Sequence, residues 1–267
     1  MTTLTDEFLH MEVAMGKILA FANQKGGVGK TTSAVNIAAA LGKRGKKTLL
    51  VDLDPQGNTT SGVGITKKGI KYSTYDVLIG NASIRDAILT TEFNQLSVIP
   101  ATMALAGAEF ELSEIEHREN CLKNALAEVV DEFDYVIIDC PPSLSQLTVN
   151  ALTAANGLVI PMQCEFFALE GLSQLMLSVK RVRQLYNPQL EITGILLTMY
   201  NGRLILSSQV VAELKKYYAE KLFKTTISRG VKLSEAPGFG KPICYYDPFG
   251  KGSAEYADVA KELIMRI

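Results

Sequence analysis

The feature that most constrains this chain is a glycine-rich segment at residues 23–32, with the sequence NQKGGVGKTT. It follows an apolar run at 18–21 that predicts a strand, and it precedes a run at 33–41 that predicts a helix. In such a turn consecutive backbone N–H groups point at one spot, and the helix N-terminus adds partial positive charge. A polyphosphate fits that arrangement, so the segment predicts a nucleotide site. Lys30 would reach the β- and γ-phosphates, the Thr31 hydroxyl would hold Mg²⁺, and Thr32 would lie toward the α-phosphate.

The segment departs from the usual phosphate-loop pattern G-x-x-x-x-G-K-[ST], because Gln24 stands where the first glycine is expected. The variant here is K-G-G-x-G-K-T, which places an additional lysine, Lys25, at the start of the loop. An ordinary glycine turn with a solvated lysine is the alternative, but three glycines in four residues followed by Lys-Thr favour a nucleotide loop. The predicted loop contacts are Lys25, Gly26, Gly27, Val28, Gly29, Lys30, Thr31 and Thr32.

Two further apolar runs end in carboxylates. Residues 48–52 predict a buried strand that ends at Asp52, with Asp54 two residues later, and residues 133–139 predict a strand that ends at Asp139. Ligands of an open parallel sheet bind at the carboxyl ends of its strands, where the glycine-rich loop also lies. A turn or helix cap is the alternative for Asp52 and Asp54, and a plain strand end is the alternative for Asp139. Beside a phosphate loop, Asp139 predicts a Mg²⁺ ligand, direct or through water.

The composition is that of a globular chain. It has 267 residues, 47% of them apolar, a formal net charge of −1, and no apolar run near the ~18 residues of a membrane span. The first fourteen residues include Asp6, Glu7 and Glu12 and do not resemble a secretory signal, so we expect a cytoplasmic protein. The four cysteines are isolated, which argues against a disulfide framework or a cysteine metal site. The two histidines, His10 and His117, lie in polar contexts, so histidine acid–base chemistry is not expected.

Strand-like and helix-like segments alternate along the chain. This alternation predicts one α/β domain, doubly wound, with a mostly parallel twisted sheet and the architecture of a P-loop NTPase. We assign residues 1–15 to a short amino-terminal extension and residues 16–267 to the single domain, since no linker, repeat or low-complexity tract is visible. The expected strands are 18–21, 48–52, 96–100, 133–139, 157–161, 192–199 and 222–227, and the expected helices are 30–43, 75–79, 84–89, 107–130, 169–186, 204–218 and 254–267.

Residues 23–32, followed by VDLDPQGN at 51–58, resemble the deviant Walker A loop and next motif of the ParA/MinD group of P-loop ATPases. The resemblance is strongest to the partition ATPases called ParA or Soj, and it extends over roughly residues 16–265. It implies that Lys25 reaches across a dimer interface to the phosphates held by the other subunit, so that two copies sandwich ATP. It also implies catalytic roles for Lys25, Lys30 and Asp54, with Asp54 orienting the attacking water and Asp52 supporting Mg²⁺ through water.

The same resemblance implies contacts in later loops. Cys140-Pro141-Pro142 follows Asp139 and matches the D-x-P-P switch of the family, a stiff segment suited to reporting the γ-phosphate. The family uses its T-M-Y-x-x-R region and its S-E-A-P turn near the adenine base. In this chain the predicted adenine contacts are Met199, Asn201, Arg203, Glu235, Ala236 and Pro237.

Charge is distributed unevenly along the chain. Residues 1–170 contain 13 Lys or Arg and 20 Asp or Glu, whereas residues 171–251 contain 12 and 5. A basic carboxyl-terminal third suggests an anionic partner, with a solvated basic face as the alternative. In ParA-type proteins basic residues in this region bind DNA without sequence preference, which needs phosphate contacts alone. The resemblance therefore implies DNA contacts by Lys224, Arg229 and Lys232.

The sequence thus predicts a slow Mg²⁺-dependent ATPase of chromosome or plasmid segregation, located in the cytoplasm at the nucleoid. Its predicted ligands are ATP and Mg²⁺, and its predicted partners are a second copy in the ATP state, non-specific DNA and a ParB-type protein that stimulates hydrolysis, with no membrane.

Two alternatives stay open. A MinD-like membrane-cycling ATPase requires a basic, amphipathic carboxyl-terminal helix, but residues 255–267 carry three acids and two bases. A metabolic ATPase of the same superfamily would have paired cysteines if it were an iron–sulfur carrier, and this sequence has none. A ligase-type enzyme would instead show a substrate pocket.

Overall fold

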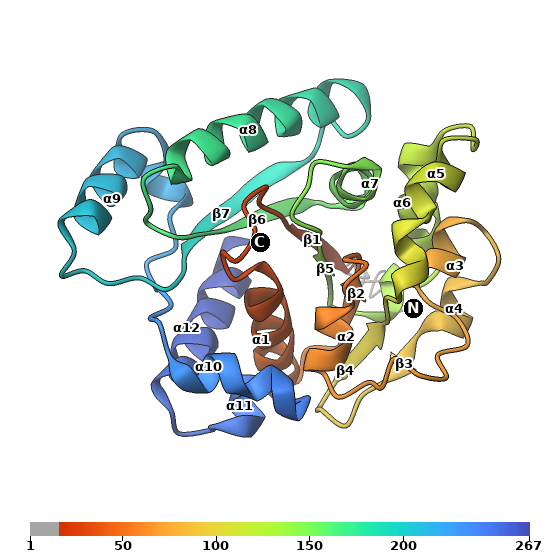
Figure 1. Cartoon of the computed structure of the whole chain (residues 1–267), viewed down its shortest axis with the longest axis horizontal. Coiled ribbons are helices and arrows are strands. Elements are labelled where there is room, and N and C mark those ends of the chain that lie inside the picture. Colours follow the sequence, from red (N-terminus) through yellow and green to blue (C-terminus); the bar gives the residue numbers. More distant parts are fainter. Residues whose placement is uncertain (1–15) are drawn as a thin grey trace, which may run out of the picture.

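The computed structural model describes residues 16–267, so the predicted extension at 1–15 lies outside the described residues. They form one seven-stranded sheet in the order β3-β4-β2-β5-β1-β6-β7 (Figure 1). Every neighbouring pair is parallel except β3 and β4 at one edge, which are antiparallel. The predicted doubly wound α/β fold is therefore confirmed. The strands are β1 (Lys17–Phe21), β2 (Thr48–Asp52), β3 (Leu89–Thr90), β4 (Leu96–Ile99), β5 (Tyr135–Asp139), β6 (Gly157–Met162) and β7 (Glu191–Leu197).

Helices cover both faces of the sheet. The main ones are α1 (Lys30–Lys43), α2 (Asn58–Gly62), α3 (Thr74–Leu78), α4 (Ile84–Ala87), α5 (Ala108–Leu112), α6 (Cys121–Ala127), α7 (Gln146–Ala154), α8 (Ala168–Leu185), α9 (Ile205–Tyr218), α10 (Val231–Glu235), α11 (Ile243–Tyr246) and α12 (Lys251–Arg266). Figure 1 shows α1 and α12 together on one side of the strands and α7 and α8 on the other. Within residues 16–267, no helix combines the length and apolar character needed to cross a membrane.

The sheet separates two apolar layers. Leu19 and Phe21 of β1 pack into the layer under α1 and α12, whereas Ile18 and Ala20 pack into the layer under α6, α7 and α8. This alternation follows from the strand geometry, because successive side chains point to opposite faces. Since both faces are covered, β2, β5 and β6 are buried at every position. The continuous apolar runs of the sequence are therefore central strands.

The long helix predicted at 107–130 is wrong, because the structure breaks this stretch into α5, α6 and short 3₁₀ turns. His117 has a left-handed backbone (φ 56°), which a continuous helix does not tolerate. The side chain of Asn150 in α7 also takes two backbone groups there. Its amide donates to Arg118 O (2.9 Å), and its Oδ1 accepts from Leu122 N (3.1 Å). The Asn150 side chain thus makes hydrogen bonds with backbone groups that would bond to each other in a continuous helix.

The strand predicted at 222–227 is also wrong. This stretch runs beside β7 but makes only two isolated bridges with the segment 195–200, through Leu222 and Ser228. The carboxylate of Glu262 in α12 accepts hydrogen bonds from Lys224 N (2.8 Å) and Thr225 N (3.2 Å). These two N–H groups are therefore not available to a sheet ladder. The sequence also gave no signal for α2, α7, α10 and α11, most of which are five residues or shorter.

The strand order reverses at β1, and this positions the site. The chain passes from β1 to β2 on one side and reaches β6 later on the other side. A crevice forms outside the carboxyl ends of the strands at such a switch point. Asp139 pairs in register with both Phe21 at the end of β1 and Asp52 at the end of β2. The glycine-rich loop and the two carboxylates therefore meet at one rim.

Candidate active site

The glycine-rich loop adopts the conformation of an anion-binding turn. Gly27 (φ 74°) and Gly29 (φ 83°) have left-handed backbones, and α1 begins immediately afterwards at Lys30. Such angles are what glycine permits at no steric cost. The Lys30 ammonium is buried and donates to Lys25 O (3.2 Å), so its side chain folds back over the loop. Burial lowers the pKa of Lys30, against the attraction of Asp139 and Asp54.

The loop is fixed from the ends of β6 and β7. Asn23 donates to Pro161 O (2.8 Å) and accepts from Lys25 N (3.0 Å). On the other flank, Thr198 Oγ1 donates to Val28 O (2.7 Å). Gln163 Nε2 donates to the carbonyl of Gly27 (2.7 Å). With its carbonyls bound from outside, the loop keeps its N–H groups free to face a ligand.

Asp139 is the side chain of the site best suited to bind a cation. Its Oδ2 accepts hydrogen bonds from the hydroxyls of Thr31 and Thr59, both at 2.7 Å. Its Oδ1 is buried and has no hydrogen-bond partner among residues 16–267. A buried carboxylate oxygen without a partner is costly, and burial raises the pKa of Asp139. Mg²⁺ prefers one or two carboxylates completed by substrate phosphates, so Thr31 and Asp139 beside a phosphate loop fit that ion.

Both carboxylate oxygens of Asp52 accept hydrogen bonds from groups of the protein itself. Its Oδ2 accepts from the backbone N–H (2.8 Å) and the hydroxyl (2.6 Å) of Thr60, and its Oδ1 accepts from Asp54 N (3.2 Å). Burial raises the pKa of Asp52, and the neighbouring charge of Asp139 raises it further. The carboxylate therefore ties the start of α2 to the loop that carries Asp54. Any support that it gives to Mg²⁺ is indirect.

Asp54 lies on the short loop between β2 and α2, largely buried beside the rim. Its Oδ1 accepts from Gln56 N (2.9 Å), which closes a tight turn. Lys67 donates in turn to Gln56 O. The turn is thus held from both sides, and the position of Asp54 is compatible with orienting a water at the phosphate end of the site.

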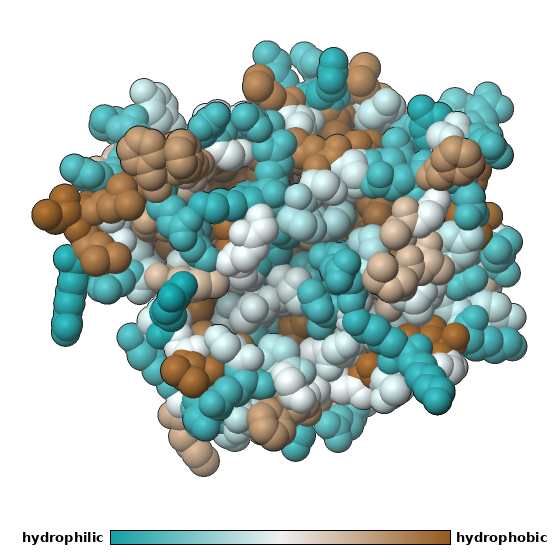
Figure 2. Space-filling view, in the orientation of Figure 1, coloured by the Kyte–Doolittle hydropathy of each residue, from teal (hydrophilic) through white to brown (hydrophobic). Residues whose placement is uncertain are grey.

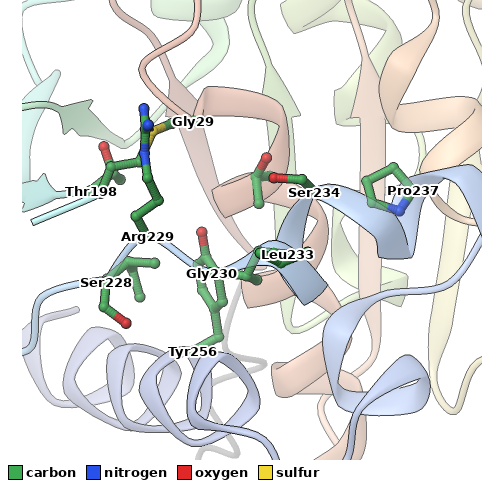
Figure 3. Close-up of a pocket in the computed structure, with 13 residues that line it drawn as sticks. Gly29, Thr198, Ser228, Arg229, Gly230, Leu233, Ser234, Pro237 and Tyr256 are labelled. Atoms are coloured by element: carbon green, nitrogen blue, oxygen red, sulfur yellow. The ribbon is translucent and has the colours of Figure 1, made fainter.

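A cavity of about 590 Å³ opens beside the phosphate loop (Figure 3). Its walls come from Gly29 and Thr32, from the end of β7, from residues 227–237 and from Tyr256 of α12. This size is within the range of small-ligand pockets. Of the predicted adenine contacts, Met199 and Pro237 line it. The walls are mainly apolar, which suits a planar base.

The other predicted adenine contacts lie elsewhere. Ala236 lines a second cavity of about 400 Å³, on the other side of Pro237. Asn201 and Arg203 are exposed on the loop after β7, and neither lines a cavity beside the phosphate loop. Glu235 accepts from Tyr246 (3.0 Å) and pairs with Lys232 (3.3 Å).

The comparisons with known proteins agree with this geometry. A protein-family profile described as an AAA domain matches residues 16–192. The chain is 55% identical to the sporulation initiation inhibitor protein Soj of Bacillus subtilis, with 93% of this chain and 98% of that protein covered. It is 49% identical to the chromosome partitioning protein ParA of Caulobacter vibrioides, with 94% of each covered. The chain belongs to the ParA/Soj family of chromosome-partitioning ATPases.

Solved structures share the fold of this ParA/Soj-family chain. One is the cobyrinic acid a,c-diamide synthase of Mycobacterium smegmatis with bound ADP and magnesium (38% identity, TM-score 0.82, 94% of each chain covered). Another is a putative plasmid partition protein of Borrelia burgdorferi bound to AMPPNP (29% identity, TM-score 0.78, 94% and 99% covered). A third is the cell division ATPase MinD of Pyrococcus furiosus (26% identity, TM-score 0.79, 95% and 100% covered).

The signature lysine of the ParA/Soj family, Lys25, forms an ion pair with Glu165 on the connection between β6 and α8. The side chains are 38% and 48% exposed, so Lys25 lies at the surface beside the phosphate loop. Hydrophobic side chains gather near this point, over the start of α8 and over α9 (Figure 2). The exposed ones there include Phe166, Phe167 and Ile205.

The predicted DNA contacts fall in two places. Lys224 and Lys232 are exposed on the surface of the carboxyl-terminal third, and Lys232 lies over the ring of Tyr246 (5.4 Å). Arg229 instead lies in the wall of the 590 Å³ cavity. All three side chains are exposed, and Arg229 differs from the two lysines in lining this cavity.

Several residues of the site had no sequence signal. Thr59, Thr60 and Gln163 hold Asp139, Asp52 and the loop, but hydroxyl and amide side chains are common in any polar stretch. Tyr256 reaches the cavity from the last helix, 226 residues after the phosphate loop ends at Lys30.

Proposed function

We propose that this chain is a slow Mg²⁺-dependent ATPase whose ATP-bound form is a dimer. The dimer binds DNA without sequence preference and works with a ParB-type partner in chromosome or plasmid segregation, in the cytoplasm at the nucleoid. The observation that carries the ATPase part is the unpartnered Oδ1 of Asp139, buried beside Thr31 at the mouth of the phosphate loop. A charge arrangement of this kind suits a Mg²⁺–nucleotide complex.

The chemistry follows from the chain's own groups. The loop N–H groups and Lys30 would bind the β- and γ-phosphates and stabilise the charge that develops there. Asp54 would orient the attacking water. Bound Mg²⁺ would supply charge neutralisation, held by Thr31 and Asp139. The turnover number for ATP hydrolysis is expected to be well below the ~10 s⁻¹ of a median enzyme. The reason is that His117, the one histidine among residues 16–267, lines neither cavity beside the phosphate loop. No imidazole base is therefore available there.

The dimer proposal rests on Lys25 and its surroundings. Lys25 is at the surface, held by one partly exposed ion pair that is weak enough to exchange. Phe166 and Phe167 are 76% and 64% exposed beside it, and exposed aromatic pairs favour a protein contact. A second copy that covers this face would receive Lys25 near its own phosphates, as the family resemblance implies.

Two observations weigh against the alternatives. For membrane cycling, the apolar stripe of α12 would have to face lipid, but Tyr256, Val259 and Leu263 are buried against the rest of the domain. Against a ligase-type enzyme, the sequence identity to the cobyrinic acid a,c-diamide synthase is 38%, lower than the 55% identity to Soj.

Three single substitutions test the ATPase and dimer. Lys30→Ala should abolish nucleotide binding. Asp54→Ala should bind ATP, fail to hydrolyse it and accumulate as a dimer, whereas Lys25→Ala should bind ATP as a monomer and not turn over. Nucleotide titration, phosphate release and light scattering in ATP measure these. A wild type and an Asp54→Ala variant that both stay monomeric in ATP at micromolar protein would refute the sandwich dimer.

The DNA proposal is tested on the exposed lysines. Lys224→Glu and Lys232→Glu should weaken binding to any duplex, and each lost phosphate contact should reduce the log–log salt slope by about 0.9. Lys123→Glu, in the acidic half of the chain, is a matched control that should leave binding unchanged. Binding that is strongly sequence-selective, or that does not depend on ATP, would contradict the proposal.

A further inference from the structure

Arg229 has an unusual position for a residue of the basic segment. Figure 3 shows its side chain rising from the chain toward Gly29 of the phosphate loop. Its Nη2 lies 3.7 Å from Met199 Sδ. The same sulfur accepts from Gln163 Nε2 (3.1 Å), and that amide also binds the carbonyl of Gly27. A short series of contacts therefore connects the Arg229 guanidinium to the phosphate loop.

The Arg229 guanidinium has no counter-charge within residues 16–267. Among residues 16–267, no carboxylate lies within 4.0 Å of it, whereas basic residues nearby do have such partners. Lys232 pairs with Glu235, and Lys251 pairs with Glu255. Arg229 is thus a cation directed into a cavity that also exposes Gly29 and Thr32. An anion in that cavity would be its natural partner.

The backbone that carries Arg229 is held in place. Ser228 donates to the Glu255 carboxylate through both its N–H (3.0 Å) and its hydroxyl (3.1 Å). Ile227 N donates to Leu197 O (2.8 Å), and Tyr200 N donates to Ile227 O (2.9 Å). The residues before Arg229 are therefore anchored to α12 and to the end of β7. The guanidinium is presented from a fixed point.

We propose that Arg229 is a nucleotide-binding residue, whose guanidinium contacts the phosphates of the bound nucleotide. The planar fork of arginine matches phosphate oxygens better than a lysine does. The contact would put a cation on the cavity side of the phosphates, opposite Mg²⁺ on the Asp139 side. It would also tie the segment that leads into α10, where Lys232 lies, to the presence of nucleotide. This inference rests on the proposed nucleotide site.

The test compares Arg229→Ala, Arg229→Lys and the control Lys261→Ala, at an exposed lysine of α12. Dissociation constants for ADP and for ATP with Mg²⁺ are measured without DNA, in protein dilute enough to be monomeric by light scattering. Arg229→Ala should weaken both nucleotides by about ten-fold or more, because a charge-assisted hydrogen bond is lost. Arg229→Lys should restore part of the affinity, and Lys261→Ala should have no effect. Thermal unfolding without nucleotide should be the same in all three.

The outcomes separate the two proposals. If the protein that keeps Arg229 binds neither nucleotide, the proposed nucleotide site itself fails. If it binds and Arg229→Ala binds equally well, only the inference on Arg229 is overturned. A lowered unfolding temperature in Arg229→Ala without nucleotide would indicate a structural role and would also overturn it.

Discussion

The two sides of the phosphate loop are built in opposite ways. On one side, Asp52 and Asp139 end adjacent central strands, are fully buried, and are fixed by hydroxyls of α1 and α2. On the other side, the cavity wall at 227–237 consists of short turns and a five-residue helix, with Arg229 and Val231 exposed. We call these the carboxylate side and the cavity side. The first is set by the register of the sheet and the second by contacts between distant segments.

This difference assigns different tasks to the two sides. A cation site must hold its ligands within a few tenths of an ångström, and buried strand ends provide that rigidity. A surface that must respond to nucleotide needs a low free-energy cost of rearrangement. The short exposed elements that follow the anchored residues 227–228 provide that. We therefore expect the carboxylate side to fix the chemistry and the cavity side to report it.

The largest expected effect is on the carboxylate side. Asp139→Asn keeps the shape of the side chain but removes the charge that faces Mg²⁺, so ATP turnover should fall by about a hundred-fold or more. Because burial raises the pKa of this carboxyl, its charge is unfavourable in the folded protein, and the free energy of unfolding should not fall. Phosphate release and urea unfolding measure the two. Asp134→Asn, at the exposed end of the same run, is the control and should keep turnover.

A matched pair of leucines compares the rigidity of the two sides. Leu53, between Asp52 and Asp54, is completely buried, whereas Leu233 in the cavity wall is only partly buried. Leu53→Ala should lower the free energy of unfolding by about 2–5 kcal/mol, the usual cost of a core cavity. Leu233→Ala should cost about 1 kcal/mol or less. Equal costs in urea unfolding would show that the cavity side is as firmly packed as the sheet and would remove the distinction.

The smallest expected effect concerns Lys25. Glu165→Gln removes the acidic partner of the signature lysine and frees it to leave its own subunit. A partly exposed ion pair contributes at most about 1 kcal/mol, so the protein concentration needed for ATP-dependent dimers should fall by about two- to five-fold. Light scattering against concentration measures this shift. Glu170→Gln, on the exposed surface of α8, should leave it unchanged. A weaker dimer in Glu165→Gln would mean that the carboxylate helps Lys25 to bind across the interface.

The carboxylate side could be predicted from the sequence because its signals are local. An apolar run that ends in Asp52 or Asp139 specifies a buried strand and its carboxyl end, and parallel pairing then brings those ends together. The phosphate-loop glycines are also a local signal, because glycine adopts the left-handed backbone angles of Gly27 and Gly29 without steric cost. The loop and the two strand ends do meet at one rim of the sheet.

The cavity side could not be predicted in the same way. Tyr256, Leu233 and Arg229 meet only after α12 has packed against α1, and no local pattern encodes that meeting. The same limit explains the errors in secondary structure. Asn150 and Glu262 hydrogen-bond to backbone groups of segments far away in sequence. For this reason neither a continuous helix through residue 120 nor a strand through residue 224 forms. The resemblance to the family supplied the region of Met199 and Pro237 but not the direction of each side chain.

The tie between Glu262 and the segment after α9 has a consequence for solubility. β7 is an outer strand of the sheet, and an outer strand with free N–H and C=O groups invites another chain to add a strand and aggregate. Residues 222–228 cover that edge without becoming an extendable strand, because Glu262 occupies Lys224 N and Thr225 N. The opposite edge is the two-residue β3, too short to act as a template. Neither edge of the sheet in residues 16–267 therefore offers a long free strand to which a second copy could pair. Contact between copies through side chains is favoured instead.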